Sequence, residues 1–240
     1  MRKVPFVNGE FYHIYNRGVD KREIFSDRDD LERFFQSMSE FNTVEPIGSI
    51  YENSFRKVRK EKMSSLGNPT SKSPKLVNIV CYCLNPNHYH FILEQLTDNG
   101  ISYFMKRLGG YAKYFNERYK RSGTLFQGRF KAIHVDSNEY LLHLSAYVNL
   151  NNHVHQLGRS TSKLVKSSWG EYIGGASDGG SNNANAVTGI ENRIQGFCSK
   201  DMILGQFKNP LEYKNFAEES LEGIVEKRRE YQGLDGLLLE

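Results

Sequence analysis

Hydrophobic and polar side chains alternate along three stretches of the chain: residues 11–16, 77–83 and 88–95. In a strand the side chains at i and i+2 share a face, so this alternation predicts strands. Asn85-Pro86-Asn87 separates the second stretch from the third, and Pro and Asn are typical turn residues. We therefore expect residues 77–95 to form a β-hairpin.

Other stretches repeat their apolar side chains every three to four residues, which predicts helices. One helix is expected from Asp27, as its N-cap, to about Asn42. A second is expected from a cap at Thr97 or Asp98 to about Tyr119. Gly109-Gly110 lies in its middle, and each glycine costs roughly 1 kcal/mol relative to alanine, so we expect a kink or a close backbone approach there.

Residues 126–135 are expected to be extended, and a third helix is expected at 138–151. Asp136 and Glu139 fit the N-cap and the reciprocal acid of a capping box. At helical spacing, Tyr147 and Asn151 lie one turn apart on the same face.

The organisation expected from these elements is one main domain with an appendage. Residues 1–155 carry most of the predicted strands and helices. Within them, residues 52–75 are rich in Lys, Arg, Ser and Pro, which predicts a flexible basic insertion. Residues 156–240 begin with a loop-rich stretch and continue with small helices, so we expect a mainly helical C-terminal extension.

Composition excludes several classes. The 240 residues carry 32 Lys and Arg against 28 Asp and Glu, so the net charge is only +4, and nucleic-acid binding must be argued from the placement of charge. The three cysteines predict reduced thiols in a cytoplasmic protein. We see no signal peptide and no run of roughly 20 apolar residues that would predict a membrane span.

The candidate chemistry begins with His88 and His90, which are two residues apart on a predicted strand. Their imidazoles are expected on the same side of the strand, with Tyr89 on the other, where they form half of a site for a divalent metal ion. The alternative is a pair of surface or hydrogen-bonded core histidines.

Tyr147 and Asn151 offer the groups that such a half-site lacks. The Asn151 amide oxygen is a suitable ligand for a hard cation. A tyrosine hydroxyl, with a pKa of about 10, becomes a useful nucleophile only where a cation stabilises the developing charge. Together the four side chains suit metal-assisted phosphoryl transfer with a covalent intermediate. The alternative for Tyr147 is a helix residue that packs its ring in the core.

Aromatic residues alternate with Lys and Arg between Tyr103 and Lys131. This pattern is typical of single-stranded nucleic-acid binding, in which rings stack on bases and cations neutralise phosphates. The alternative is a solvated basic surface, and Arg17 and Arg129 could equally hold turns. The candidate DNA-binding residues are Arg17, Lys21, Arg22, Lys106, Arg107, Lys113, Arg129 and Lys131.

Several motifs, in order, resemble a known family. Leu84-Asn85-Pro86-Asn87-His88-Tyr89-His90 is similar to the His-hydrophobic-His signature of HUH nucleases in its single-tyrosine transposase form. Residues 123–131 resemble a conserved segment of that group, and residues 147–151 resemble the motif that contains its tyrosine. Residues 13–18 and 167–172 fit the REP-associated tyrosine transposase branch. Phe126, Asn152 and the 52–75 insertion depart from the usual pattern.

The resemblance implies an α+β, ferredoxin-like (RRM-like) fold, in which an antiparallel sheet has helices on one face. By motif position, Tyr147 is the nucleophile and His88, His90 and Asn151 hold Mg²⁺ or Mn²⁺. The implied activity is cleavage and rejoining of single-stranded DNA near hairpins through a 5′-phosphotyrosine. We expect the protein to be a monomer or a homodimer. We expect no membrane partner, and we expect the protein to associate with the nucleoid when it is bound to DNA.

Three other functions remain open at this point. A non-catalytic single-stranded nucleic-acid-binding module of the same fold would not need His88, His90 or Tyr147. A replication or mobilisation HUH enzyme would need helicase or primase regions, for which 240 residues leave little room. A metal-dependent hydrolase would use water instead of Tyr147.

Overall fold

The centre of the protein is a five-stranded antiparallel sheet, with strands in the order β4-β1-β3-β2-β5. The computed structural model describes residues 5–56, 73–154, 164–174 and 196–231. The strands are β1 (Phe11–Arg17), β2 (Val77–Asn85), β3 (His88–Gln95), β4 (Lys131–Val135) and β5 (Lys166–Ser167). All three predicted strands and the 77–95 hairpin are thus confirmed.

The first four strands have the ferredoxin-like connectivity. Helix α1 (Arg28–Glu40) connects β1 to β2, the hairpin connects β2 to β3, and helices α3 (Gly100–Leu108) and α4 (Tyr111–Arg118) precede β4. This β-α-β-β-α-β order with antiparallel neighbours confirms the predicted α+β fold class. Strand β5 extends the sheet at the β2 edge.

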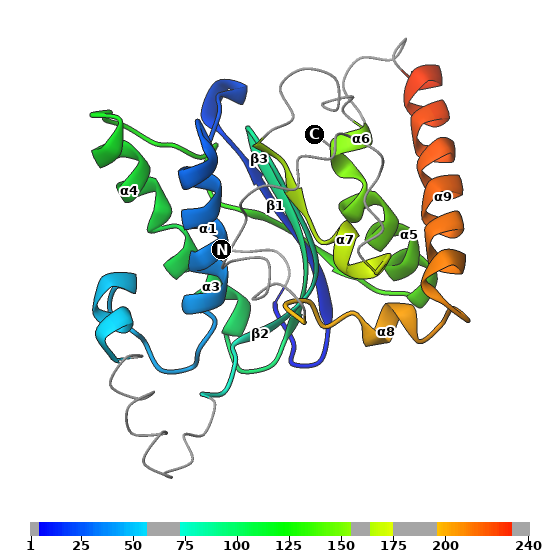
Figure 1. Ribbon diagram of the computed structural model, residues 1–240, viewed down its shortest axis with the longest axis horizontal. Coiled ribbons are helices and arrows are strands. Elements are labelled where there is room, and N and C mark those ends of the chain that lie inside the picture. The colour runs from blue at the N-terminus through cyan, green and yellow to red at the C-terminus, as the bar shows by residue number, and fades with distance from the viewer. Residues whose placement is uncertain (1–4, 57–72, 155–163, 175–195, 232–240) are drawn as a thin grey trace, which may run out of the picture.

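Helices cover both faces of the sheet (Figure 1). Helices α1, α3 and α4 lie on the face toward which Tyr89 points, where Phe34 of α1 packs on its ring. This is the predicted helical layer. The opposite face is covered by α5 (Asn138–Asn149), and α9 (Pro210–Tyr231) packs against α5.

Three details of the helices differ from the sequence prediction. The helix expected at 97–119 is two helices that break at Gly109-Gly110, so the glycines end one helix instead of kinking it. Its N-cap is Asn99, in the left-handed region with φ 59°, in place of Thr97 or Asp98. Ser137, not Asp136, caps α5, because its side chain accepts a hydrogen bond from the Tyr140 N–H.

The helix that carries Tyr147 ends earlier than predicted. Helix α5 stops at Asn149, and a separate short helix, α6, spans Asn151–Val154. Leu150 between them has φ −105° and ψ 15°. Tyr147 and Asn151 therefore lie on neighbouring helices, not on one continuous face.

The C-terminal elements pack on the same sheet. Helices α7 (Trp169–Tyr172) and α8 (Asp201–Leu204) follow β5, and α9 lies against α5. The Tyr213 hydroxyl of α9 bonds to Ser145 and Asn149 of α5. The division at residue 155 stays a prediction.

Two further segments complete the described chain. Residues 19–21 form the short 3-10 helix η1 (Val19–Lys21). Residues 50–56 are helical, and most of the predicted 52–75 insertion, from 57 to 72, lies outside the described residues. Within the described residues, no helix is long and apolar enough to cross a membrane.

Candidate active site

The β2–β3 turn places His88 and His90 on the sheet face that α5 covers. The Pro86 carbonyl accepts hydrogen bonds from the backbone N–H groups of Ile24 and Phe25, at 2.7 and 3.1 Å, and the Asn87 carbonyl accepts from Gly18 at 2.8 Å. A Cβ at Gly18 would lie 2.0 Å from the Arg22 carbonyl oxygen, so only glycine fits there. The turn is therefore fixed on a second segment of chain.

His88 is held by three asparagines. Its Nδ1 lies 2.6 Å from Asn87 Oδ1, which can only accept, so Nδ1 donates. Its Nε2 lies 2.9 Å from both Asn85 Nδ2 and Asn151 Oδ1. Burial lowers the pKa of His88, while the hydrogen bond to Asn151 acts in the opposite direction. In the neutral ring with its proton on Nδ1, Nε2 accepts a hydrogen bond from Asn85 Nδ2.

This arrangement fits a divalent cation. In the neutral ring, His88 Nε2 and Asn151 Oδ1 both present lone pairs at 2.9 Å, and the Asn85 amide donates to each of them. Adjacent ligands on an octahedral Mg²⁺, with bonds of about 2.1 Å, are about 3 Å apart. The Asn87 contact on Nδ1 is the outer hydrogen bond that ligating histidines usually make. Among the described residues, no group of three or more His, Cys, Asp or Glu is placed to hold a metal. A three-ligand metal site here would therefore need the Asn151 amide oxygen in addition to His88 and His90.

His90 is buried next to the same centre. Its ring lies 5.3 Å from the His88 ring, centroid to centroid, and is nearly perpendicular to it. Its Nδ1 lies 2.9 Å from Nε2 of His13, a buried residue of β1. Burial lowers the pKa of His13 to about 4, so His13 is neutral at pH 7.

Tyr147 reaches the same side of the sheet as the paired imidazoles. Its half-buried ring stands edge-on to His90, with centroids 5.5 Å apart, and edge-on to His13 at 6.3 Å. The structure therefore brings together all four predicted side chains, His88, His90, Tyr147 and Asn151. Their catalytic roles stay predictions.

Cations border this centre. Tyr15 pairs across the sheet with His90 on one side and with Lys131 on the other. The Lys131 ammonium lies 5.7 Å from the Tyr15 ring centroid. Arg17 pairs with His88, and its guanidinium donates to Gln127. An aromatic ring and two predicted DNA-binding cations thus lie along one edge of the site.

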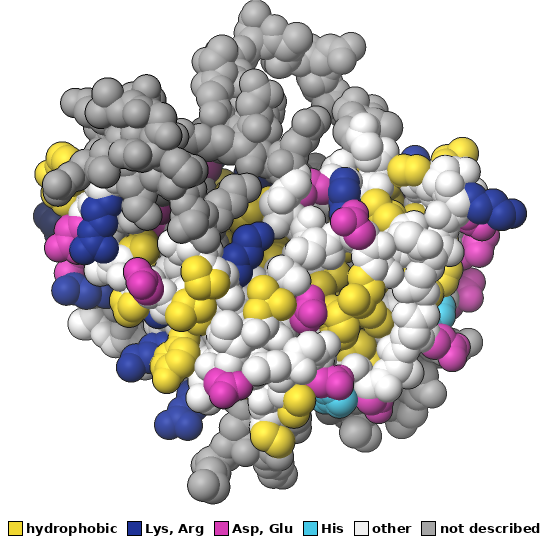
Figure 2. All heavy atoms as spheres, turned by 90° about the horizontal axis from the view of Figure 1, so that it is seen from below, with side chains coloured by type: hydrophobic (Ala, Val, Ile, Leu, Met, Phe, Trp, Pro, Cys, Tyr) yellow, Lys and Arg dark blue, Asp and Glu magenta, His cyan; other side chains and the backbone are white. Residues whose placement is uncertain are grey.

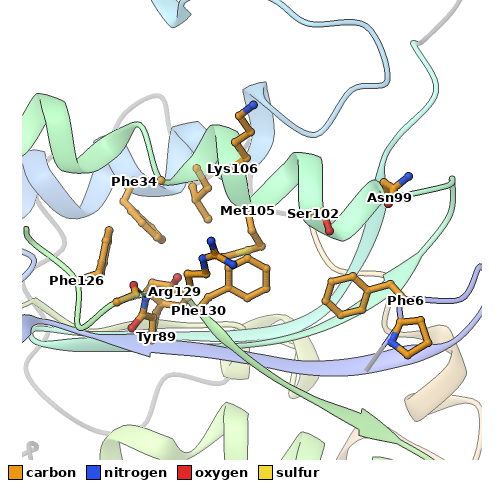
Figure 3. A pocket seen from close by; sticks show the side chains of 15 residues that line it. Phe6, Phe34, Tyr89, Asn99, Ser102, Met105, Lys106, Phe126, Arg129 and Phe130 are labelled. Carbon is orange, nitrogen blue, oxygen red and sulfur yellow. Dashed lines mark hydrogen bonds between the residues drawn. The ribbon is translucent and has the colours of Figure 1, made fainter. Parts of the chain in front are cut away.

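A second candidate surface lies on the opposite face of the sheet. A cavity of about 1020 Å³ lies between α3 and residues 126–130, and Tyr89 lines it. Figure 3 shows the aromatic rings of Phe126, Phe130 and Phe34 around this cavity with Lys106 and Arg129. Two predicted DNA-binding residues therefore meet here, behind the strand that carries His88 and His90.

The other predicted DNA-binding residues are dispersed. Arg107 donates to the carbonyls of Phe41, Thr43 and Val44, which is a structural role. Lys113 pairs with Glu117 at 3.6 Å and Arg22 with Asp20 at 3.3 Å. Lys21 is exposed in η1. In Figure 2 most of the visible Lys and Arg side chains lie on the left, the side of α1, α3 and α4 in Figure 1.

Two other histidines, His134 and His143, make exposed side-chain hydrogen bonds. His134 bonds to Glu10 at 3.0 Å, and His143 bonds to Ser220 of α9.

Sequence reasoning had not assigned a role in the site to His13, Tyr15, Asn85 or Asn87. A signal existed for His13 and Tyr15, because alternation along β1 places both on one face. The partners of that face became known only from the register with β3.

A comparison with protein families agrees with the motif resemblance. Residues 52–152 match the family model described as "Transposase IS200 like", and this range contains His88, His90, Tyr147 and Asn151. No curated protein matches the chain. A solved structure described as a REP-associated tyrosine transposase bound to a REP hairpin is similar, at 14% identity and a TM-score of 0.42, over 78% of this chain and 96% of that chain. Over residues 52–152, the resemblance to IS200-like transposases is confirmed.

Proposed function

We propose, because residues 52–152 match the family model of IS200-like transposases, that the protein cleaves and rejoins single-stranded DNA through Tyr147. The observation that supports this most directly is the convergence of Tyr147 and His90, whose ring centroids lie 5.5 Å apart. Helix α5 and strand β3 supply the two groups, so the fold itself creates the arrangement.

The proposed first step is attack of the Tyr147 hydroxyl oxygen on a DNA phosphorus atom. A bond forms between this oxygen and phosphorus, and the bond from phosphorus to the 3′ oxygen breaks. The phenol proton passes to solvent, and the departing 3′ oxygen takes up a proton to become a 3′-OH. The product carries the downstream strand on Tyr147 as a 5′-phosphotyrosine. Attack by another 3′-OH reverses the step and joins two strands, without an external energy source.

Mg²⁺ or Mn²⁺ would be held by His88, His90 and Asn151, and when bound would neutralise charge on the scissile phosphate. The asparagines around His88 keep its Nε2 lone pair in place for this purpose. Asn151 contributes a neutral oxygen, which leaves the positive charge of the cation undiminished. The phenol of Tyr147 is held beside the same centre by α5.

The proposed substrate is single-stranded DNA with a hairpin, as the sequence motifs imply. On the catalytic face, Tyr15 is half-buried and Lys131 is exposed, which suits one base and one phosphate next to the cleaved bond. On the other face, Lys106 and Arg129 line the same cavity as Phe34, Phe126 and Phe130. We propose both surfaces as DNA contacts.

The test is covalent capture of DNA. A pool of hairpin oligonucleotides with randomised flanks and a label at the 3′ end is incubated with the protein and Mn²⁺, then analysed under denaturing conditions. We expect a labelled protein band, absent for Tyr147→Phe and present for Tyr140→Phe, a matched change on the same helix. Chelation of the metal should remove the band.

The remaining outcomes separate the other functions. Cleaved DNA without a protein band would indicate a hydrolase, and DNA binding without cleavage would indicate a non-catalytic module. A band of undiminished intensity in Tyr147→Phe would overturn the assignment of the nucleophile.

A further inference from the structure

His13 is a buried histidine to which the proposed chemistry assigns no role. It lies on β1, it is 5% exposed, and its Nε2 is 2.9 Å from His90 Nδ1. Two imidazole nitrogens at this distance share one proton, because one must donate and the other accept. The position of that proton decides which nitrogen of His90 is left with a lone pair.

Only one of the two arrangements leaves His90 able to bind a metal through Nε2. If His13 donates, the neutral His90 ring carries its proton on Nε2 and has no lone pair there. If His90 Nδ1–H donates to His13 Nε2, the lone pair of His90 is on Nε2. Ligating histidines usually donate their second ring N–H to a neighbour in this way.

His13 is itself held firmly enough to act as that acceptor. Its ring stacks on Tyr15, with centroids 4.8 Å apart and planes at 28°, and meets Tyr147 edge-on. The His13 and His90 rings are also nearly parallel, at 20°. These contacts on several sides limit rotation of His13, so the direction of its Nε2 is fixed.

We propose that His13 is a positioning residue for the metal centre: its Nε2 accepts the Nδ1–H of His90 and so fixes both the tautomer and the orientation of the His90 ring. This inference rests on the proposed metal-dependent function. His13 acts only through His90. Asn87 has the same role toward His88, through its Oδ1, so each histidine ligand has its own acceptor.

The test compares Mn²⁺ affinity by calorimetry, without DNA, among variants of the full chain. His13→Phe keeps an aromatic ring but has no acceptor, and we expect Mn²⁺ binding about 10–100-fold weaker. His13→Gln restores an acceptor oxygen at similar reach and should recover most of the affinity. Tyr12→Phe is the matched control, because it removes a buried hydroxyl from the adjacent residue of β1, which faces away from the site.

A second readout reports the tautomer itself. In the metal-free protein, the ¹⁵N shifts of the His90 ring should show a protonated Nδ1 in wild type and His13→Gln, and a mixture of tautomers in His13→Phe. Purely structural damage would lower stability in both His13 variants without this pattern.

The outcomes separate the two levels of inference. If wild type binds no Mn²⁺, or if His90→Ala binds it equally well, the proposed metal site itself is wrong. If His90→Ala weakens binding but His13→Phe does not, the metal site stands and the role of His13 is overturned. Equal losses in His13→Phe and His13→Gln, with an unchanged His90 tautomer, would also overturn it.

Discussion

The Tyr147 ring lies edge-on to the His90 ring, with centroids 5.5 Å apart, although one belongs to a helix and the other to the sheet beneath it. Their relation therefore depends on how α5 is seated on β2 and β3. What holds α5 in place is as important for the proposed chemistry as the reacting groups themselves.

Tyr213 of α9 is one such support. It is fully buried, and its hydroxyl lies 3.0 Å from Ser145 Oγ and accepts from Asn149 Nδ2 at 2.9 Å, both in α5. Tyr213→Phe removes the acceptor of Asn149 Nδ2, while Ser145 Oγ still donates to the Leu142 carbonyl, so we expect a loss of about 1–3 kcal/mol in the free energy of unfolding. Denaturant titration measures it. Tyr103→Phe, at a tyrosine that is 49% exposed, is the control and should have no effect. An unchanged stability for Tyr213→Phe would mean that the hydroxyl does not secure α5.

Asp27 predicts a pH dependence of stability. Burial alone raises the pKa of Asp27, but the Asp30 N–H, the Tyr119 hydroxyl and the Arg118 guanidinium outweigh this effect and hold the pKa below its usual 3.8. Because the folded-state pKa is depressed, the stabilisation is present above pH 3.8 and is lost as the pH falls through the folded-state value.

The test is Asp27→Asn, which keeps an N-cap for α1 but removes the charge. We expect the variant to be less stable than wild type above about pH 5, with the difference shrinking as Asp27 becomes protonated. Thermal unfolding between pH 3 and 7 measures this. A constant difference across that range would contradict the charge interaction.

Lys106 and Arg107 are adjacent in sequence and should respond differently to substitution. Lys106 is exposed and lines the cavity behind β3, whereas Arg107 donates to three backbone carbonyls. Lys106→Ala should weaken DNA binding and lower the slope of log affinity against log salt by about 0.7–0.9, with unchanged stability.

Arg107→Ala should instead lower stability by about 1–3 kcal/mol, because hydrogen bonds from a charged donor are lost. Fluorescence anisotropy with labelled hairpin DNA and denaturant titration separate the two effects. An unchanged salt slope for Lys106→Ala would remove this surface from the proposed DNA contacts.

Much of the fold could be predicted from local pattern. Alternation in β1, β2 and β3 and the Asn-Pro-Asn turn are local signals, and the structure contains the elements that they predict. The break at Gly109-Gly110 was underestimated, because helix propensity alone does not show whether tertiary packing will hold two helical halves in line. The end of α5 before Asn151 also has no local signal, because Leu150, where the helix ends, is a residue that favours helices.

The candidate site was predictable in its members but not in its hydrogen bonds. His88 and His90 follow from strand alternation, while the position of Tyr147 followed from the family motif. The contact between His13 and His90 depends on the register of β1 against β3, which no local pattern determines. The roles of Asn85 and Asn87 likewise depend on the geometry of the turn.

The central claim is that Tyr147 itself becomes joined to DNA, and peptide mapping of the trapped complex tests it most directly. Trypsin cleavage at Lys131 and Arg159 would release one peptide that holds both Tyr140 and Tyr147, so fragmentation mass spectrometry must distinguish them. We predict a nucleotide phosphate on Tyr147, carried by the 3′-labelled strand. A phosphate on Tyr140, on another residue, or on no residue at all in a reaction that still cleaves DNA would contradict it.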